Sequence, residues 1–397
     1  MPQTWAVQQM REQRSALAFY LHVPFCASRC GYCDFNTYTA SELGSDLATI
    51  SRDTWADYAI REIARARVSA HLAGDDRPLT AVFFGGGTPT QVPAAHLVRV
   101  LAELRRQFGF IDEVEVTTEA NPDSVDATYL QNLRDGGFTR ISFGHQSSAS
   151  HVLRVLERTH TPGRTWEAIA SAHAAGFEHI NVDLIYATPG ETDDDLRRTL
   201  DDVVAAPVDH VSAYSLIVES GTRLAAQVRR GEVPMPDDDI AALRYGIIDE
   251  RLQAAGLNWY EVSNWATPKG ECQHNLAYWR NHDWWGIGPG AHSHIDGHRW
   301  WNAKHPATWA AALTAEDSII AGEEFIDVDD RWVETIMLGL RLREGLAVAD
   351  IAPDRLAAAE RWRNDGFLDS AAMLGGRLVL TDTGRLLADA IVRDLTS

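Results

Sequence analysis

The sequence predicts an α/β protein in which a curved, partly closed barrel of parallel strands is followed by a smaller α+β unit. Two observations lead to this fold class. Short β-rich runs alternate with amphipathic helical patterns six times between residues 16 and 219, which is typical of right-handed βαβ units on a parallel sheet. In addition, glycines or polar residues follow each predicted strand, at the edge where such folds gather their chemistry.

The predicted elements can be placed in order along the first half of the chain. The strands are expected at residues 16–23, 79–84, 113–118, 140–143, 179–186 and 210–218. The helices between them are expected at residues 54–72, 94–108, 127–136, 164–175 and 192–205. Six such runs in succession predict one continuous, curved sheet with helices outside it.

The pattern changes after Glu219. A helix is expected at residues 240–255, a strand at 259–264, and an aromatic, His-rich and Gly-rich segment at 274–301. A last unit is predicted to have helices near 331–342, 348–351 and 355–365, a hairpin around Gly375-Gly376 and a final helix after 381–384. It resembles a winged helix, although that fold alone does not indicate DNA binding. We therefore expect an N-terminal segment 1–15, a barrel with its extension at 16–300, and a C-terminal unit at 301–397.

Charge and cysteine content exclude several classes of protein. The formal net charge of -20, from 36 basic and 56 acidic residues among 397, argues against a nucleic-acid partner and against attraction to anionic lipid. The four cysteines predict no disulfide framework, which fits a reducing compartment. No signal-peptide pattern precedes residue 16, and no apolar run is long enough to span a bilayer. We expect a cytoplasmic protein.

Cys26, Cys30 and Cys33 form a C-x3-C-x2-C group directly after the first predicted strand. Thiolates so close together on one loop suggest an iron-sulfur site, and a 4Fe-4S cluster needs four ligands where this segment offers three. One iron would therefore stay open to a small chelating ligand. The alternatives are a structural zinc site, to which His22 would have to add the fourth ligand, and buried unreactive thiols.

The cysteine spacing resembles the signature of the radical SAM superfamily, whose open iron binds the amine and carboxylate of S-adenosylmethionine (SAM). The resemblance implies a partial (β/α)6 TIM-type barrel, and Gly85-Gly86-Gly87-Thr88-Pro89 matches the family motif that receives the methionine amine, although a glycine run alone could be a plain turn. The SAM contacts that the family motifs imply are Tyr20, Tyr32, Gly86, Gly87, Thr88, Glu119, Gln146, Arg158 and Asp183. The alternatives are a surface ion pair of Arg158 with Glu157 or a neighbouring acid, and strand-end capping by Gln146 and Asp183.

A second constellation lies in the aromatic segment, as Cys272-Gln-His274-Asn-Leu-Ala-Tyr-Trp279 followed by Trp284-Trp-Gly-Ile-Gly-Pro-Gly-Ala-His-Ser293. Histidine and flat aromatic surfaces suit haem, but composition alone favours a Trp-rich core. Together with Tyr260-Glu-Val-Ser-Asn264, these motifs resemble the HemW-type haem-chaperone branch of the coproporphyrinogen III dehydrogenase-like family, over nearly the whole chain. The resemblance implies that His274 is a haem ligand, and we interpret Cys272 as an ordinary buried thiol.

Three functions follow from this resemblance. The first is a haem chaperone that carries a 4Fe-4S cluster and SAM and delivers haem to haem-requiring respiratory proteins, with transient membrane-protein contact and homodimerisation as open questions. The second is the sister activity, oxygen-independent oxidative decarboxylation of coproporphyrinogen III. The third is a radical reaction on another tetrapyrrole. The sister enzymes have a further Cys where this chain has Phe35 and a longer N-terminal extension, so we favour the chaperone.

Overall fold

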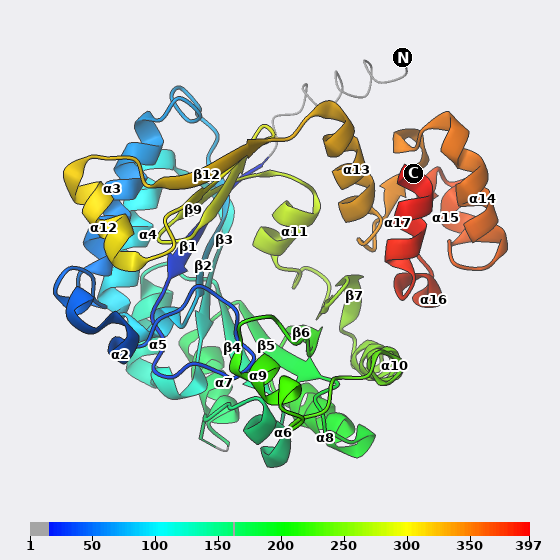
Figure 1. The fold of residues 1–397 in the computed structure, drawn as a ribbon, viewed down its shortest axis with the longest axis horizontal. Helices are drawn as coiled ribbons and strands as arrows, with labels where there is room; N and C mark the ends of the chain where they lie inside the picture. Colours follow the sequence, from blue (N-terminus) through cyan, green and yellow to red (C-terminus); the bar gives the residue numbers. More distant parts are fainter. Residues whose placement is uncertain (1–15, 162) are drawn as a thin grey trace.

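The computed structural model describes residues 16–161 and 163–397, so the predicted N-terminal segment 1–15 lies outside the described residues (Figure 1). A twelve-stranded sheet runs through the molecule in the order β12-β11-β10-β9-β1-β2-β3-β4-β5-β6-β8-β7. Strands β1 to β6 are parallel neighbours in chain order. The prediction of a parallel, partial α/β barrel is therefore confirmed.

The barrel strands and their helices follow the predicted order closely. The strands are β1 (Leu17–Val23), β2 (Leu79–Gly86), β3 (Phe110–Ala120), β4 (Arg140–Gln146), β5 (His179–Tyr186) and β6 (His210–Ser215). The helices between and after them are α2 (Ala40–Leu43), α3 (Trp55–Val68), α4 (Ala94–Phe108), α5 (Ala127–Asp135), α6 (Ser150–Val155), α7 (Arg164–Ala175), α8 (Asp193–Ala205), α9 (Arg223–Arg229) and α10 (Asp238–Ala254).

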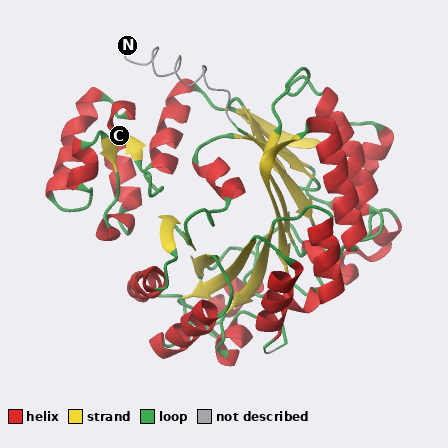
Figure 2. Ribbon diagram, turned by 180° about the vertical axis from the view of Figure 1, so that it is seen from behind, coloured by secondary structure: helices red, strands yellow, loops and turns green. Residues whose placement is uncertain are grey.

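Burial explains why these segments form strands and helices. Every residue of β1 except the half-buried Tyr20 is buried, as expected for a parallel strand that is covered on both faces. Helix α8 begins at a capping box in which Thr192 and Asp195 exchange hydrogen bonds, and this satisfies amide groups that the first turn leaves free. The helices cover the convex face of the sheet, and α11 lies on its concave side (Figure 2).

The sheet extends further than the sequence predicted. Strand β9 (Asp283–Ile287) adds to β1 in parallel, and β10 (His292–Ile295), β11 (His298–Asn302) and β12 (Ile320–Phe325) continue the sheet antiparallel. At the other edge lie β7 (Asn258–Glu261) and β8 (Asn264–Ala266). Helices α11 (Gln273–Trp279) and α12 (Pro306–Ala315) complete this part. Because residues 301–325 belong to the large sheet and its helices, we propose a division near residue 326 instead of 300.

The C-terminal unit has a core of its own, formed by Ile336, Leu340, Leu378, Ile391 and Leu395 among others. Its elements are α13 (Val328–Gly339), β13 (Leu346–Ala347), α14 (Leu356–Asn364), α15 (Ser370–Leu374), β14 (Arg377–Leu378), α16 (Asp382–Arg385) and α17 (Ala388–Thr396). The predicted hairpin around Gly375-Gly376 is confirmed only as an isolated antiparallel bridge between Leu368 and Leu380. The glycines follow the end of α15, and β14 pairs with the distant β13. The likeness to a winged helix stays a prediction.

The C-terminal unit packs beside the open side of the barrel (Figure 1). Arg385 forms an ion pair with Asp249 of α10 at 3.1 Å and lies 4.1 Å from the ring centroid of Trp259. The amide of Arg343 donates to the carbonyl of Tyr260 at 2.8 Å. Within the described residues, no helix is both long and apolar enough to cross a bilayer.

Candidate functional site

The cysteine loop follows β1 and is anchored to its surroundings by backbone hydrogen bonds. The amide of Cys26 donates to the carbonyl of Tyr38 at 3.0 Å. Further along the loop, the amide of Gly31 donates to Leu156 at 3.1 Å, and the carbonyl of Gly31 accepts from Leu224 at 2.9 Å. The loop is thereby held against the segments that follow β4 and β6, so that its thiols are presented at the carboxyl-end mouth of the barrel.

The three thiols are half buried and lie close enough for the charges of Cys33 and Cys30 to act on Cys26. Burial, followed by the charge of Cys33, raises the pKa of Cys26 to about 11, and burial likewise raises the pKa of Cys33. Thiolates so close together repel one another, and bound iron would relieve this repulsion. Among residues 16–161 and 163–397, no three His, Cys, Asp or Glu side chains converge as a single metal ion requires.

The glycine loop after β2 approaches the cysteine loop closely. A Cβ atom on Gly87 would lie 3.0 Å from Sγ of Cys26 and 2.6 Å from the carbonyl oxygen of Phe25. Gly86 has a φ of 113°, which favours glycine, and its amide donates to Oε2 of Glu119 at 3.1 Å. The glycine loop therefore packs directly against the cysteine loop, which leaves no room for a side chain at Gly87.

Gln146 and Arg158 lie on the β4 side of the cysteine loop. Gln146 has a φ of 72° next to a register shift in β4, and such bulges re-aim a side chain at the end of a strand. Nη1 of Arg158 lies 3.6 Å from Sγ of Cys30, and its Nη2 donates to the carbonyl of Gly144 at 2.7 Å. Oε1 of Gln146 and Nε of Arg158 are buried without a partner among the described residues. A polar ligand would satisfy such atoms.

One of the alternatives for Arg158 is wrong. Its expected partner Glu157 instead pairs with Arg223, at 3.0 Å. Tyr32, on the cysteine loop, packs against the apolar cluster that contains Val152 and Leu156, and burial together with the charge of Cys30 raises its pKa. Thr88 Oγ1 lies 4.0 Å from Sγ of Cys26. The predicted residues on β2, on β4 and in the cysteine loop therefore surround the thiols.

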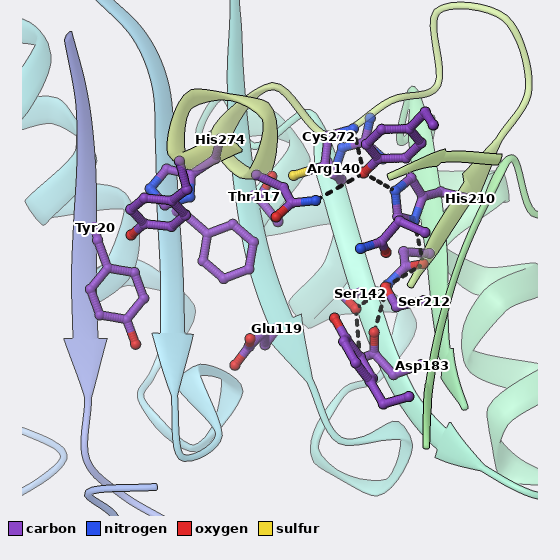
Figure 3. Close-up of a pocket in the computed structure, with 17 residues that line it drawn as sticks. Tyr20, Thr117, Glu119, Arg140, Ser142, Asp183, His210, Ser212, Cys272 and His274 are labelled. Atoms are coloured by element: carbon purple, nitrogen blue, oxygen red, sulfur yellow. Dashed lines mark hydrogen bonds between the residues drawn. The ribbon is translucent and has the colours of Figure 1, made fainter. Parts of the chain in front are cut away.

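A cavity of about 150 Å³, here called the inner pocket, lies inside the barrel (Figure 3). Figure 3 shows Glu119 and Asp183 toward the carboxyl ends of their strands and His274 at the opposite end of the pocket. Both oxygens of Asp183 accept hydrogen bonds, from Ser142 at 2.8 Å and from Asn181 at 2.7 Å. Burial and the charge of Asp183 raise the pKa of Glu119 to about 8.

A buried ion pair, of which Arg140 lines the same pocket, holds the start of α11. Nε of Arg140 donates to Oε2 of Glu115 at 2.9 Å, and both side chains are almost fully buried. Glu115 also accepts from the backbone amides of Gln273 and His274, each at 3.0 Å, and from the thiol of Cys272 at 3.3 Å. Burial, with the charge of Glu115, raises the pKa of Cys272. This environment is consistent with an ordinary buried thiol at Cys272, and its role stays a prediction.

His274 lies in the wall of the inner pocket and is 2% exposed. Its ring packs against Phe83 at 5.0 Å and against Tyr278, edge-on, at 4.8 Å between centroids. Burial lowers its pKa to about 4, so the imidazole is neutral near pH 7. Its Nε2 has no hydrogen-bond partner among the described residues.

A second, larger cavity of about 540 Å³, here called the outer cleft, opens at the mouth of the barrel beside the cysteine loop. Tyr20, Glu119 and Tyr278 line both cavities, so the two adjoin. The other residues that line the outer cleft are His22, Arg29, Asp34, Phe35, Asn36, Gly86, Trp284, Gly290, Ala291, His292 and Lys304.

Comparison with known proteins agrees with this geometry. The model of the radical SAM superfamily matches residues 20–203. A Mycobacterium tuberculosis protein named heme chaperone HemW is 50% identical over 383 residues, which cover 95% of this chain and 94% of that protein. A Lactococcus lactis protein of the same name is 32% identical over 83% of this chain and 82% of its own length. The chain belongs to the HemN/HemW-type radical SAM family.

The fold of this family is also that of a solved structure. Coproporphyrinogen III oxidase (HemN) from Escherichia coli, described as a radical SAM enzyme, superposes with a TM-score of 0.80 over 97% of this chain and 91% of that one, at 23% identity. Family membership implies a 4Fe-4S cluster and SAM as cofactors. The three thiols, the loop Gly85-Gly86-Gly87, here called the glycine cradle, and the unpartnered polar atoms of Gln146 and Arg158 fit this pair. When bound, the cluster and SAM would supply radical chemistry.

Several residues of the site come together only in space and have no local signal in the sequence. Glu115 and Arg140 sit within strands, where a lone charge gives no local signal, and their partners on α11 are far along the chain. His292 and Lys304 line the outer cleft. In the sequence, His292 is part of the glycine-rich motif at residues 284–293, but the motif alone assigned it no role. The individual SAM contacts, Asp183 in the inner pocket among them, stay predictions.

Proposed function

We propose that this protein is a haem chaperone, which binds haem and passes it to haem-requiring proteins while holding a 4Fe-4S cluster and SAM. The observation that carries the proposal is the likeness to proteins named heme chaperone HemW, at 50% identity over 95% of the chain. The outer cleft supports it, because a carrier must hold its cargo where a second protein can reach it, and this cleft opens at the surface next to the cysteine loop.

The character of the outer cleft suits a porphyrin. Haem is flat and apolar, with two propionate groups on one edge. The cleft offers the aromatic side chains of Phe35, Tyr278 and Trp284 together with the cations Arg29 and Lys304. Such a mixture of apolar surface and a few placed polar groups is typical of sites for small molecules.

The sequence-based ligand His274 fits this proposal under one condition. A cavity of about 150 Å³ accommodates a molecule the size of benzene, and the inner pocket onto which His274 faces has this volume. A haem would reach Nε2 of His274 only if α11 moved away from the barrel. The assignment of His274 therefore stays a prediction that requires a conformational change.

The proposal is tested by haem uptake and transfer. The cluster is reconstituted anaerobically in the full chain, haem is added stepwise, and the porphyrin absorption is followed before and after gel filtration. We expect a single haem per chain that co-elutes with the protein and moves to an added haem-free acceptor such as apomyoglobin. Absence of co-eluting haem from a cluster-loaded sample would refute the proposal.

The second candidate is oxidative decarboxylation of coproporphyrinogen III. The observation in its favour is that the barrel keeps the three thiols and the glycine cradle intact, as an active radical enzyme requires. Anaerobic incubation of the cluster-loaded protein with coproporphyrinogen III, SAM and a reductant should then yield protoporphyrinogen IX.

A radical reaction on another tetrapyrrole is tested by adding haem to a parallel sample. Faster SAM cleavage in the presence of haem, or a chemically altered haem, would indicate such a reaction.

We further propose that the recipients are respiratory haem proteins, reached from the cytoplasm by transient contact, including contact with membrane proteins. The acidic balance of the chain suits recognition of a protein partner better than adhesion to anionic lipid. Light scattering with and without haem decides between a monomer and a homodimer.

A further inference from the structure

We propose that haem binds in the outer cleft, with the imidazole of His292 as the iron ligand and with Lys304 and Arg29 as partners of the propionates. The inference rests on the proposed function and deepens it, because it assigns the cargo to a site that is open in the structure as it stands. It differs from the assignment of His274 in the ligand, in the cavity and in requiring no movement of α11.

The position of His292 suits an axial ligand. It is the first residue of β10, exposed at the rim of the cleft, and its ring stacks on that of Trp301 with centroids 5.6 Å apart and planes 23° apart. No hydrogen bond or ion pair involves its imidazole in the described part of the chain. Partial burial and the charge of Lys304 lower its pKa. A neutral imidazole with a free nitrogen is the form that binds iron.

Cations stand out in this cleft because the chain is strongly acidic. Lys304 is one of only two lysines among the 397 residues, and it is exposed at the rim. Arg29 lines the cleft from the cysteine loop and forms an ion pair with Glu42 at 3.3 Å. Both side chains of this pair are exposed. Exposed ion pairs contribute little energy, so a propionate can replace Glu42 at small cost.

The apolar walls match the faces of a porphyrin. Phe35 is 60% exposed, although an aromatic ring normally buries most of its surface. Tyr278 and Trp284 meet edge to face at 4.7 Å between centroids. A bound haem would cover Phe35, which explains why an exposed aromatic residue stands beside the cysteine loop.

The two sides of the cleft are tied together before any ligand binds. The side-chain amide of Asn36 donates to the carbonyls of Pro289, at 3.0 Å, and of Lys304, at 2.8 Å. On the same rim, buried Glu62 accepts from the amide of Gly288 at 2.8 Å and from Asn302 at 2.7 Å. A cleft fixed in this way loses little conformational entropy when the ligand binds.

Cluster, SAM and haem would then be neighbours. Gly86 and Glu119, two of the predicted SAM contacts, lie in the same cleft as His292. Haem bound at the His292 and Lys304 end would therefore lie close to SAM, and loss of the haem ligand should leave the SAM end intact. SAM binding is thus an internal control for the test.

The test compares matched histidine variants of the full, cluster-loaded chain. Haem titration followed by absorption and by electron paramagnetic resonance is carried out for the unsubstituted protein, His292→Ala, His274→Ala and His305→Ala. His305 is the control, since it lies on the same rim but faces Asp46 at 3.7 Å and Tyr38. We expect His292→Ala to weaken haem binding about tenfold or more and to change the iron spectrum, with added imidazole restoring it.

The remaining outcomes separate the two hypotheses. If the unsubstituted protein takes up no haem, the proposed function itself fails. If it binds haem and His292→Ala has the same affinity and spectrum, the cleft assignment is overturned, and loss of haem in His274→Ala would then assign the ligand to the inner pocket. Lys304→Glu should weaken binding without changing the spectrum, and retention of full affinity would exclude its pairing with a propionate.

Discussion

Gly87 and Cys26 approach so closely that a methyl group on Gly87 would lie 3.0 Å from the sulfur. It would also lie 2.6 Å from the carbonyl oxygen of Phe25, and backbone atoms do not move aside cheaply. The glycine loop and the cysteine loop are therefore in direct contact. A single added carbon on Gly87 would displace the segment that carries Cys26.

Gly87→Ala is therefore expected to lower the iron and sulfide content of the reconstituted protein, because overpacking of about 1–3 kcal/mol displaces the Cys26 segment. Gly246→Ala in α10 is the matched control, since nothing lies within 4 Å of its added Cβ. Iron and sulfide are measured per chain after gel filtration. Equal content in the two variants would contradict the role assigned to the cradle.

Glu119 should make the stability of the cluster-free protein depend on pH. Its pKa is raised to about 8, first by burial and then by Asp183, so the folded state keeps a proton that the unfolded state releases near its ordinary pKa. Stability is then greatest below that ordinary value and falls as the pH rises toward 8.

Glu119→Gln removes this ionisation while keeping an acceptor for Gly86. Relative to the variant, the unsubstituted protein should lose about 3–4 kcal/mol of unfolding free energy between about pH 5 and about pH 8.5. Urea denaturation at both pH values measures the difference. Parallel pH profiles for the two proteins would show that Glu119 titrates normally.

Arg140→Met should destabilise the fold by about 3–5 kcal/mol, because it leaves the carboxylate of Glu115 buried without its cation. Burial raises the pKa of Glu115, but the charge of Arg140 and the amides of His274 and Gln273 hold it below the ordinary value. Without Arg140 the loss should be larger at about pH 8 than at about pH 5, because a protonated Glu115 needs no cation.

The control is Arg230→Ala, which breaks an exposed pair with Glu232 and should cost little stability, because exposed ion pairs contribute little. Denaturant titration, with the Trp fluorescence as the signal, compares the two variants. Similar losses in both would mean that the buried pair does not hold α11 in place.

Cys272→Ala should leave both iron content and haem affinity unchanged. The thiol donates to Glu115, and burial raises its pKa, so it is a poor ligand at neutral pH. The loss of one hydrogen bond should cost about 1 kcal/mol of stability. A marked fall in haem affinity, measured by the same titration, would make Cys272 a second ligand after all.

The outline of the barrel could be predicted from the sequence because its signals are local. Apolar runs and helical periodicity placed β1 to β6 to within a few residues. Strands β9 to β12 were not predicted, since they are short, rich in Trp, His and Gly, and paired largely antiparallel, without a regular alternation of apolar and polar residues. No regular hairpin forms at Gly375-Gly376, because a glycine pair indicates a turn but does not determine which segments pair as strands beside it.

The sequence by itself identified the family and predicted the cysteine ligands, because Cys26, Cys30 and Cys33 lie on one short loop and their spacing is the signal. The tertiary structure alone decided the size of the two cavities, the burial of His274 and the meeting of Phe35 with His292 and Lys304 across one cleft. The physical reason is separation along the chain: Asn36 is hydrogen bonded to Lys304 across 268 residues, and no local pattern encodes such a contact.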